Sequence, residues 1–136
     1  MRKKGCLEQY ASATGLVRLA KRYFEKNTKN SILTGKEITA KEVFDAAKAG
    51  DAAALEITEE FGAYLGQALV NLAATVDPAV FVIGGGVSKA GDILLETVRK
   101  YFYDHASMEI RKQKLHWQLS ETMREFMVQQ NRCFKF

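Results

Sequence analysis

The sequence has few of the residues that mark secreted, metal-rich or membrane-spanning proteins. Its 136 residues include two cysteines, Cys6 and Cys133, which lie near opposite ends of the chain. Two cysteines so far apart form neither a disulfide framework nor a metal-ligand pair by spacing. No signal peptide precedes Cys6, and no apolar run approaches the roughly 18 residues that a bilayer crossing needs. We therefore expect a cytoplasmic protein that does not associate with membranes.

The sequence also lacks a concentrated charge of one sign. Its net charge is +4, and Arg2-Lys3-Lys4 is the one dense basic cluster. Elsewhere basic side chains are interleaved with acidic ones, which argues against a nucleic-acid partner. Hydrophobic residues make up 47% of the chain and charged residues 26%, the balance of a globular protein rather than a disordered one. At this length the chain fits one domain or half of a larger one.

Three helices are predicted from hydrophobic periodicity and capping residues. The first covers residues 11–26. The second begins at Thr39-Ala40-Lys41-Glu42, a capping box, and ends at Gly50. The third begins after Asp51 and ends before Pro78, because the residue that precedes a proline is pushed out of helical conformation. The large apolar residues of this third segment lie mostly along one stripe, and we therefore predict a core helix. These residues are Leu55, Phe61, Leu65, Leu69, Leu72 and Val76.

A strand, three glycines and a helix follow one another over residues 80–103. Val80–Ile83 is a continuous run of β-branched and aromatic residues, typical of a strand buried on both faces. Gly84-Gly85-Gly86 comes next, and Ser88 is the expected cap of the helix. Glycines at the carboxyl end of a strand let the backbone approach a ligand, and a helix N-terminus offers amides to an anion. A tight turn without a ligand is the alternative, because the spacing matches neither the dinucleotide fingerprint nor the P-loop.

Two motifs stand in order along the chain, GCLEQYASATG at 5–15 and ALVNLAATVDPAVFVIGGGVS at 68–88. Together with the helical segment between them, they resemble the carboxyl half of the ROK sugar kinases, especially the bacterial glucokinases. The resemblance extends from about Lys3 to Tyr103. It implies an α/β chain that forms half of an actin-like, ribonuclease-H-like ATPase fold, mostly helical, with a short buried strand before the glycine loop. Sugar and ATP bind between the two domains of that fold.

The resemblance also implies roles for individual residues. Glu8 matches the glutamate that accepts hydrogen bonds from sugar hydroxyls, a contact that rejects analogues without them. The loop Gly84-Gly85-Gly86-Val87 matches the one on which the adenosine of ATP packs. Cys6 matches the last cysteine of a zinc motif whose other three ligands are absent here, so one chain cannot close a tetrahedral site. Taken alone, Glu8 is more simply an acid favoured by a helix dipole, and Cys6 a buried small hydrophobe.

The catalytic groups of the family are missing from this sequence. The sequence does not contain the phosphate-binding motif Asp-x-Gly-Gly-Thr. It also does not contain the Asn-Asp pair that includes the family's catalytic Asp. Phosphoryl transfer depends on positioning and charge stabilisation, so we expect no activity from this chain alone. The family implies ATP and Mg as cofactors, a structural Zn, a sugar substrate and a homo-oligomer. A ROK transcriptional repressor, which keeps the sugar site and needs no nucleotide, is the alternative, and a helical interaction module is a third.

The residues after Lys112 differ in composition from the rest. They include the single Trp, four of the six Gln and one of the two His. One interpretation is an amphipathic helix with four apolar residues on one face: Leu119, Met123, Phe126 and Met127. The resemblance instead implies a strand, a loop and a helix similar to KIALATLGNDAGIYGAAK. Deleting one adenine from a coding sequence for the family-like string KTKIALATLGNDAGIYGAAK converts it to the sequence found at 112–131.

We therefore predict two regions, a ROK kinase portion at 1–112 and a frameshifted, non-native tail at 113–136. Such a tail was never selected to pack, so we expect it to be disordered or variably placed. The strand that it replaces belongs in the core sheet. Its loss predicts an open sheet edge, exposed apolar surface and self-association.

Overall fold

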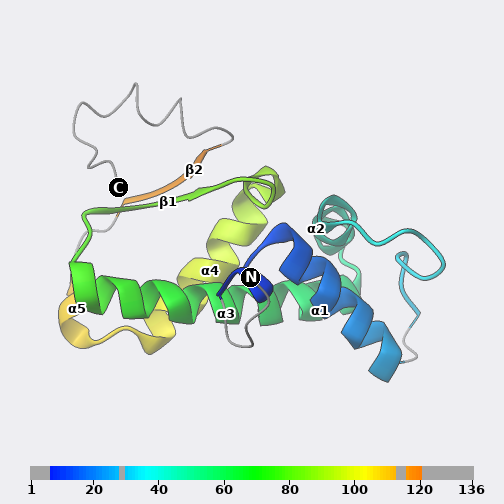
Figure 1. Cartoon of the computed structure of the whole chain (residues 1–136), viewed down its shortest axis with the longest axis horizontal. Coiled ribbons are helices and arrows are strands. Elements are labelled where there is room, and N and C mark those ends of the chain that lie inside the picture. The colour runs from blue at the N-terminus through cyan, green and yellow to red at the C-terminus, as the bar shows by residue number, and fades with distance from the viewer. Residues whose placement is uncertain (1–6, 28–29, 113–115, 121–136) are drawn as a thin grey trace.

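The structure is a computed structural model that describes residues 7–27, 30–112 and 116–120, with the last segment and Lys112 described by their backbone. A long central helix, α3, packs against α1, α2 and α4, and a short parallel sheet lies across from it (Figure 1). The elements, in chain order, are η1 (Leu7–Gln9), α1 (Ala13–Lys26), α2 (Ala40–Lys48), α3 (Ala52–Val76), β1 (Val80–Gly84), η2 (Ser88–Ala90), α4 (Asp92–His105), α5 (Met108–Lys112) and β2 (His116–Ser120). The prediction of a mostly helical α/β chain with a short strand before the glycines is confirmed.

The starts of the first three helices are fixed by side-chain caps. The Ser12 hydroxyl accepts a hydrogen bond from the amide three residues later, and α1 therefore begins at residue 13 rather than 11. Thr39 and Glu42 form the predicted capping box, in which the Thr39 amide donates to the Glu42 carboxylate at 2.9 Å. The Asp51 carboxylate accepts from the amide of Ala54 at 2.9 Å and begins α3, as predicted. These caps satisfy amides that have no partner within the helix.

Helix α3 is covered along only part of its apolar stripe. Phe61, Leu65 and Leu69 are buried, and Phe61 meets Phe44 of α2 edge to face, with ring centroids 6.1 Å apart. The prediction is wrong for three other residues, which are 39%, 46% and 64% exposed: Leu55, Leu72 and Val76. Leu55 is turned about 120° away from Phe61 around the helix. Leu72 and Val76 continue the stripe of Phe61 beyond the part of α3 that other described elements cover.

Helices α3 and α4 approach closely at two glycines. A Cβ atom added at Gly62 would lie 2.4 Å from Cγ2 of Thr97, and one added at Gly66 would lie 2.8 Å from Cβ of Tyr101. Both distances are far below van der Waals contact, so these positions require a residue without a side chain. The ion pair between Lys100 and Glu59, at 3.0 Å, joins the same two helices at the surface.

The sheet corrects the prediction for β1. Its residues alternate, with Phe81 and Ile83 buried while Val80 and Val82 are half-buried. Phe81 packs against Phe102 of α4, and their ring centroids are 5.5 Å apart. The expectation of burial on both faces is therefore wrong, because described helices pack on only one face of the strand.

The sheet also corrects the prediction for part of the tail. Residues His116–Ser120 form β2, which pairs in parallel with β1 from Val80↔His116 to Gly84↔Ser120. Such a ladder is made by main-chain groups, so it forms with side chains of almost any kind. The expectation that the tail is unplaced is wrong for this segment, and Leu119 lies in a strand rather than a helix. The rest of the predicted tail helix lies outside the described residues.

Candidate functional site

The glycine loop is a tight turn at the carboxyl end of β1. Gly85 has a φ of 83°, a conformation that other residues rarely adopt. The amide and hydroxyl of Ser88 both donate to the Gly85 carbonyl, at 3.1 and 2.7 Å. Gly84, Gly85 and Gly86 are exposed, whereas Val87 is buried in the hydrophobic core. The loop therefore presents bare backbone on its outer side and is anchored from within.

The predicted cap at Ser88 is wrong. Its hydroxyl is used inside the turn, and the short helix η2 separates the glycines from α4. Helix α4 starts after Gly91, which has φ 74° and ψ −145° and makes no side-chain cap. The first residue of α4 is Asp92, a carboxylate at the end where the helix dipole favours negative charge. The glycines consequently do not lead directly into a helix N-terminus that could receive a phosphate.

Glu8 lies on η1, just before α1, with an exposed side chain. Its main-chain carbonyl accepts a hydrogen bond from the Ser12 hydroxyl at 2.6 Å. The turn at residues 8–15, called the Glu8 corner below, is compact because Gly15 allows close approach of the main chain. A Cβ at Gly15 would lie 2.7 Å from the carbonyl group of Tyr10. These contacts fix the main chain at Glu8, so the carboxylate is offered to solvent from a defined position.

The glycine loop and the Glu8 corner meet in the folded chain. A Cβ built on Gly86 would lie 3.4 Å from Cβ of Ala13, the first residue of α1. Figure 1 shows the start of α1 close to the turn between β1 and α4. The two segments singled out in the sequence, which are far apart along the chain, therefore border one region of the surface.

The third predicted site residue, Cys6, lies outside the described residues. Within the ranges that the structure describes, no group of three His, Cys, Asp or Glu side chains is arranged to hold a metal ion. No helix in those ranges is both long and apolar enough to span a bilayer. The zinc ligand therefore stays a prediction from the resemblance.

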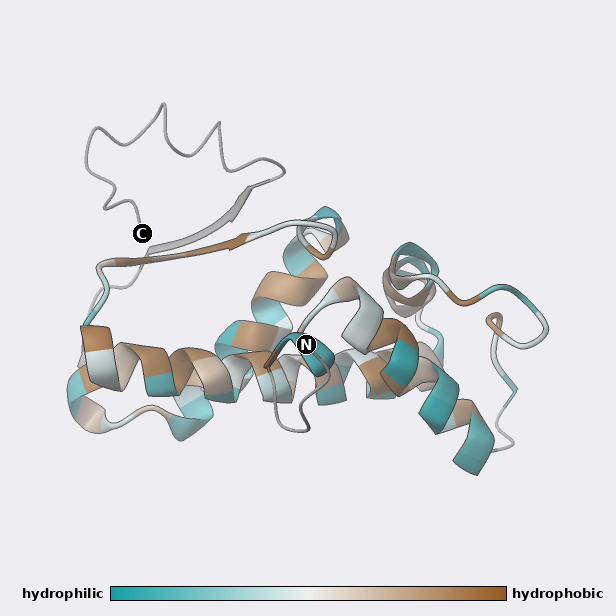
Figure 2. Ribbon diagram, in the orientation of Figure 1, coloured by the Kyte–Doolittle hydropathy of each residue, from teal (hydrophilic) through white to brown (hydrophobic). Residues whose placement is uncertain are grey.

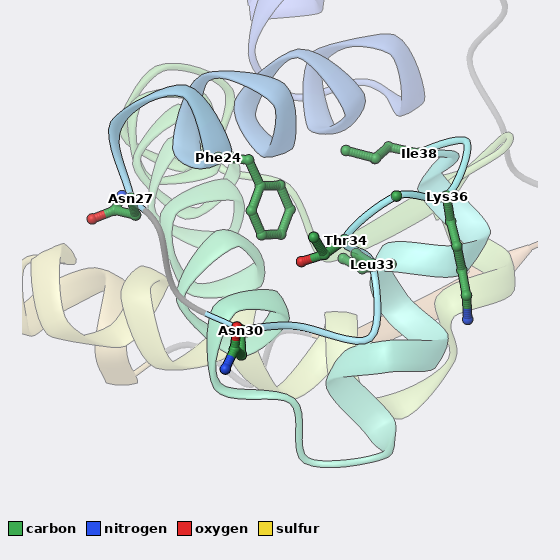
Figure 3. A pocket seen from close by; sticks show the side chains of 8 residues that line it. Phe24, Asn27, Asn30, Leu33, Thr34, Lys36 and Ile38 are labelled. Atoms are coloured by element: carbon green, nitrogen blue, oxygen red, sulfur yellow. The ribbon is translucent and has the colours of Figure 1, made fainter.

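Two hollows were not predicted from the sequence. One, of about 380 Å³, lies between the end of α1 and residues 30–38, with Phe24 facing the loop that carries Leu33 and Thr34 (Figure 3). The other, of about 570 Å³, is lined by Tyr10, Tyr64 and neighbouring residues of α3 and α4. Neither is lined by Glu8 or by the glycine loop, although the second is lined by Leu7 and Tyr10, which flank Glu8. Such hollows depend on loop packing, which periodicity does not reveal.

Comparison with known proteins decides the family. The model of the ROK family matches residues 2–124. This chain belongs to the ROK family. A glucokinase of Halalkalibacterium halodurans is 44% identical over 108 residues, which cover 76% of this chain and 33% of that protein. The DNA-binding transcriptional repressor Mlc of Escherichia coli is 33% identical over 94 residues, 69% of this chain and 23% of the repressor.

A solved structure of a ROK family protein supports the fold. The ROK glucokinase of Streptomyces griseus, solved in complex with glucose and AMPPNP, superposes with a TM-score of 0.71 and 32% identity. The superposition covers 88% of this chain and 40% of that structure. The present chain thus has part of the ROK, actin-like fold, as predicted, and spans about a third of the length of the H. halodurans glucokinase.

Proposed function

We propose that this chain is the carboxyl-terminal, sugar- and nucleotide-binding portion of an ATP-dependent ROK sugar kinase of the glucokinase type, which phosphorylates the 6-hydroxyl of glucose. The observation that carries the proposal is the close approach of Gly86 to Ala13, where a Cβ built on Gly86 would lie 3.4 Å from Cβ of Ala13, because it brings the glycine loop next to the Glu8 corner. A kinase needs its sugar and its nucleotide side by side, and these are the two segments matched to those roles.

Each part of the site fits the chemistry proposed for it. The exposed carboxylate of Glu8 is an acceptor for the vicinal hydroxyls of a sugar. The exposed glycines leave backbone unobstructed for the flat face of an adenosine, and buried Val87 anchors the loop below it. ATP with Mg would supply the phosphoryl group and its charge neutralisation. Among the described residues, no three His, Cys, Asp or Glu side chains are grouped to hold a metal ion.

The nucleotide role is tested by Gly86→Ala. The added methyl group would meet Ala13 at an ordinary contact distance of 3.4 Å, so the variant should fold like the parent. A bound adenosine would meet that methyl group, and we expect binding of AMPPNP to weaken by at least about tenfold. Calorimetry on the chain fused to the unmatched part of the H. halodurans glucokinase measures this affinity. Unchanged affinity would remove the loop from the nucleotide site.

A ROK transcriptional repressor is the second candidate, and the observation that supports it is the match to Mlc. Such a protein needs the sugar contact at Glu8 and no nucleotide at the glycine loop. The same calorimetry distinguishes the two candidates when glucose and AMPPNP are titrated separately. Binding of glucose together with AMPPNP supports the kinase, whereas binding of glucose alone supports the repressor.

A further inference from the structure

We propose that Ser12 is a positioning residue for sugar binding. Its hydroxyl donates to the main chain at Glu8 and thereby holds the Glu8 carboxylate where the sugar meets it. This role is distinct from the helix cap that the same hydroxyl provides for α1. The inference rests on the proposed function, because it takes Glu8 as the sugar contact, and it names the group that fixes this contact in place.

The first observation is that every main-chain carbonyl of η1 accepts a hydrogen bond. The Leu7 carbonyl accepts from the two amides that follow η1, at 3.0 and 2.8 Å. The Glu8 carbonyl accepts from the Ser12 hydroxyl at 2.6 Å, and the Gln9 carbonyl accepts from the Arg18 guanidinium at 3.3 Å. A single 3-10 turn is too short to be stable on its own. Two side chains of the α1 segment therefore hold the turn that carries Glu8.

The second observation is that the Ser12 hydroxyl makes two bonds with different consequences. It accepts from the Gly15 amide at 3.0 Å, which caps α1, and it donates to the Glu8 carbonyl at 2.6 Å. A hydroxyl has one proton and two lone pairs, so one group can make both bonds. The hydroxyl consequently ties the orientation of η1 to the first turn of α1.

Helix α1 is itself anchored in the core. Leu16 and Leu19 are 0% and 3% exposed, and Figure 2 shows hydrophobic and hydrophilic residues alternating along the helix, as in a helix with one buried face. The Leu16 amide donates to the Ser12 carbonyl at 2.8 Å, so Ser12 is joined directly to this buried turn.

The position of the Glu8 carboxylate depends on the main chain that carries it. Its side chain is exposed, so packing does not hold it in one place. Hydrogen bonds between a carboxylate and sugar hydroxyls need close and well-aligned groups. A displacement of about 1 Å in a binding site can cost up to about a hundredfold in function. Loss of the Ser12 donor should therefore weaken sugar binding even when the helix stays capped.

The variant Ser12→Asp separates the two roles of the hydroxyl. An ionised carboxylate accepts from the Gly15 amide as well as serine does, but it has no proton to donate to the Glu8 carbonyl. Glucose is uncharged, so the added charge does not repel it. Ser12→Thr keeps both bonds. Thr39→Ala is the matched control, because it removes an equivalent side-chain cap, from the Glu42 amide at 3.3 Å, at the start of α2.

Two measurements are made on each variant. Urea denaturation of the full 136-residue chain gives its stability. Calorimetry on the chain fused to the unmatched part of the H. halodurans glucokinase gives the affinities for glucose and for AMPPNP, titrated separately. We expect Ser12→Asp to bind glucose at least about tenfold more weakly, with unchanged stability and unchanged behaviour toward AMPPNP. Thr39→Ala should be less stable and bind glucose like the parent, and Ser12→Thr should restore the binding that Ser12→Asp loses.

Glucose affinity in Ser12→Asp equal to that of the parent would overturn the proposal. So would an equal loss of affinity in Thr39→Ala, because the loss would then follow from stability alone. Glu8→Gln, measured alongside, distinguishes this failure from that of the proposed function. If Glu8→Gln loses affinity while Ser12→Asp keeps it, the inference about Ser12 fails alone. If Glu8→Gln keeps full affinity, the sugar role of Glu8 fails, and the inference about Ser12 fails with it.

Discussion

Thr58 carries a buried hydroxyl for which the described residues provide no hydrogen-bond partner. A buried polar group without a partner costs about 1–3 kcal/mol of stability. Thr58→Val removes the hydroxyl and keeps the shape of the side chain, so we expect the free energy of unfolding to rise by about 1 kcal/mol. Urea denaturation followed by circular dichroism measures the change.

Thr97→Val is the matched control at the same scale. Thr97 is also buried, but its hydroxyl donates to the Ile93 carbonyl at 2.7 Å. Removing a satisfied hydroxyl should leave the protein equally stable or less stable. If both valine variants lower the stability alike, the hydroxyl of Thr58 has a partner and the prediction is wrong.

Single residues of the candidate site were predictable where the chemistry is local. The three glycines could be named from the sequence alone, because bare backbone directly after a strand is unusual, whereas Glu8 was named from the family resemblance, since an acid is common at the start of a helix. Ser88 was placed wrongly, because the sequence does not show whether a hydroxyl accepts from a helix amide or donates to the Gly85 carbonyl.

At the scale of elements, the contact between α3 and α4 depends on Gly62. Gly62→Ala places a methyl group 2.4 Å from Cγ2 of Thr97, so we expect a loss of about 1–3 kcal/mol of stability despite the better helix propensity of alanine. Adding Thr97→Ser removes Cγ2 and keeps the hydroxyl, and should restore part of the loss. Thermal melting of the single and double variants gives the coupling. Purely additive effects would contradict the packing described.

We expect the stability of the cap at the start of α3 to depend on pH, because it rests on the carboxylate of Asp51. Burial raises the pKa of Asp51, but hydrogen bonds from the Ala54 and Ile32 amides and the Ser31 hydroxyl outweigh it, so the net pKa is lowered. A carboxylate whose pKa is lower in the folded state stabilises the protein above its unfolded pKa of about 3.9. That contribution is lost as the pH falls through the folded pKa.

Asp51→Asn is the test of this cap. The amide keeps one acceptor oxygen but does not titrate, so the loss of stability between about pH 5 and pH 2 should be shallower than in the parent chain. Urea denaturation across that range measures the slope. An identical pH dependence in both chains would show that Asp51 does not contribute to it.

Helix boundaries could be predicted better than the covering of helix faces. The caps at Thr39 and Asp51 follow from residues within a few positions of each other, and both are confirmed. The stripe on α3 shows which side is apolar, but not which element covers it, and so Leu72 and Val76 were placed wrongly. The strand β2 was missed because main-chain pairing leaves little trace in the side chains of His116–Ser120.

At the scale of the whole molecule, the chain combines a closed helical core with an incompletely covered sheet. The core joins α1, α2 and α4 around α3, whereas β1 has one described partner strand. The predicted homo-oligomer, the cytoplasmic location and the frameshifted origin of 113–136 stay predictions. The family match itself extends past Lys112, to residue 124.

The central claim is that the Glu8 corner and the glycine loop together form the ligand site of a sugar kinase. The most direct test is ATP-dependent phosphorylation of glucose by the chain joined to the unmatched part of the H. halodurans glucokinase, with and without Glu8→Gln. The substitution replaces a charged acceptor with a neutral one, so we predict an active parent and a fall in kcat/KM of about 10- to 100-fold. An inactive parent, or a Glu8→Gln variant with full activity, would contradict the account.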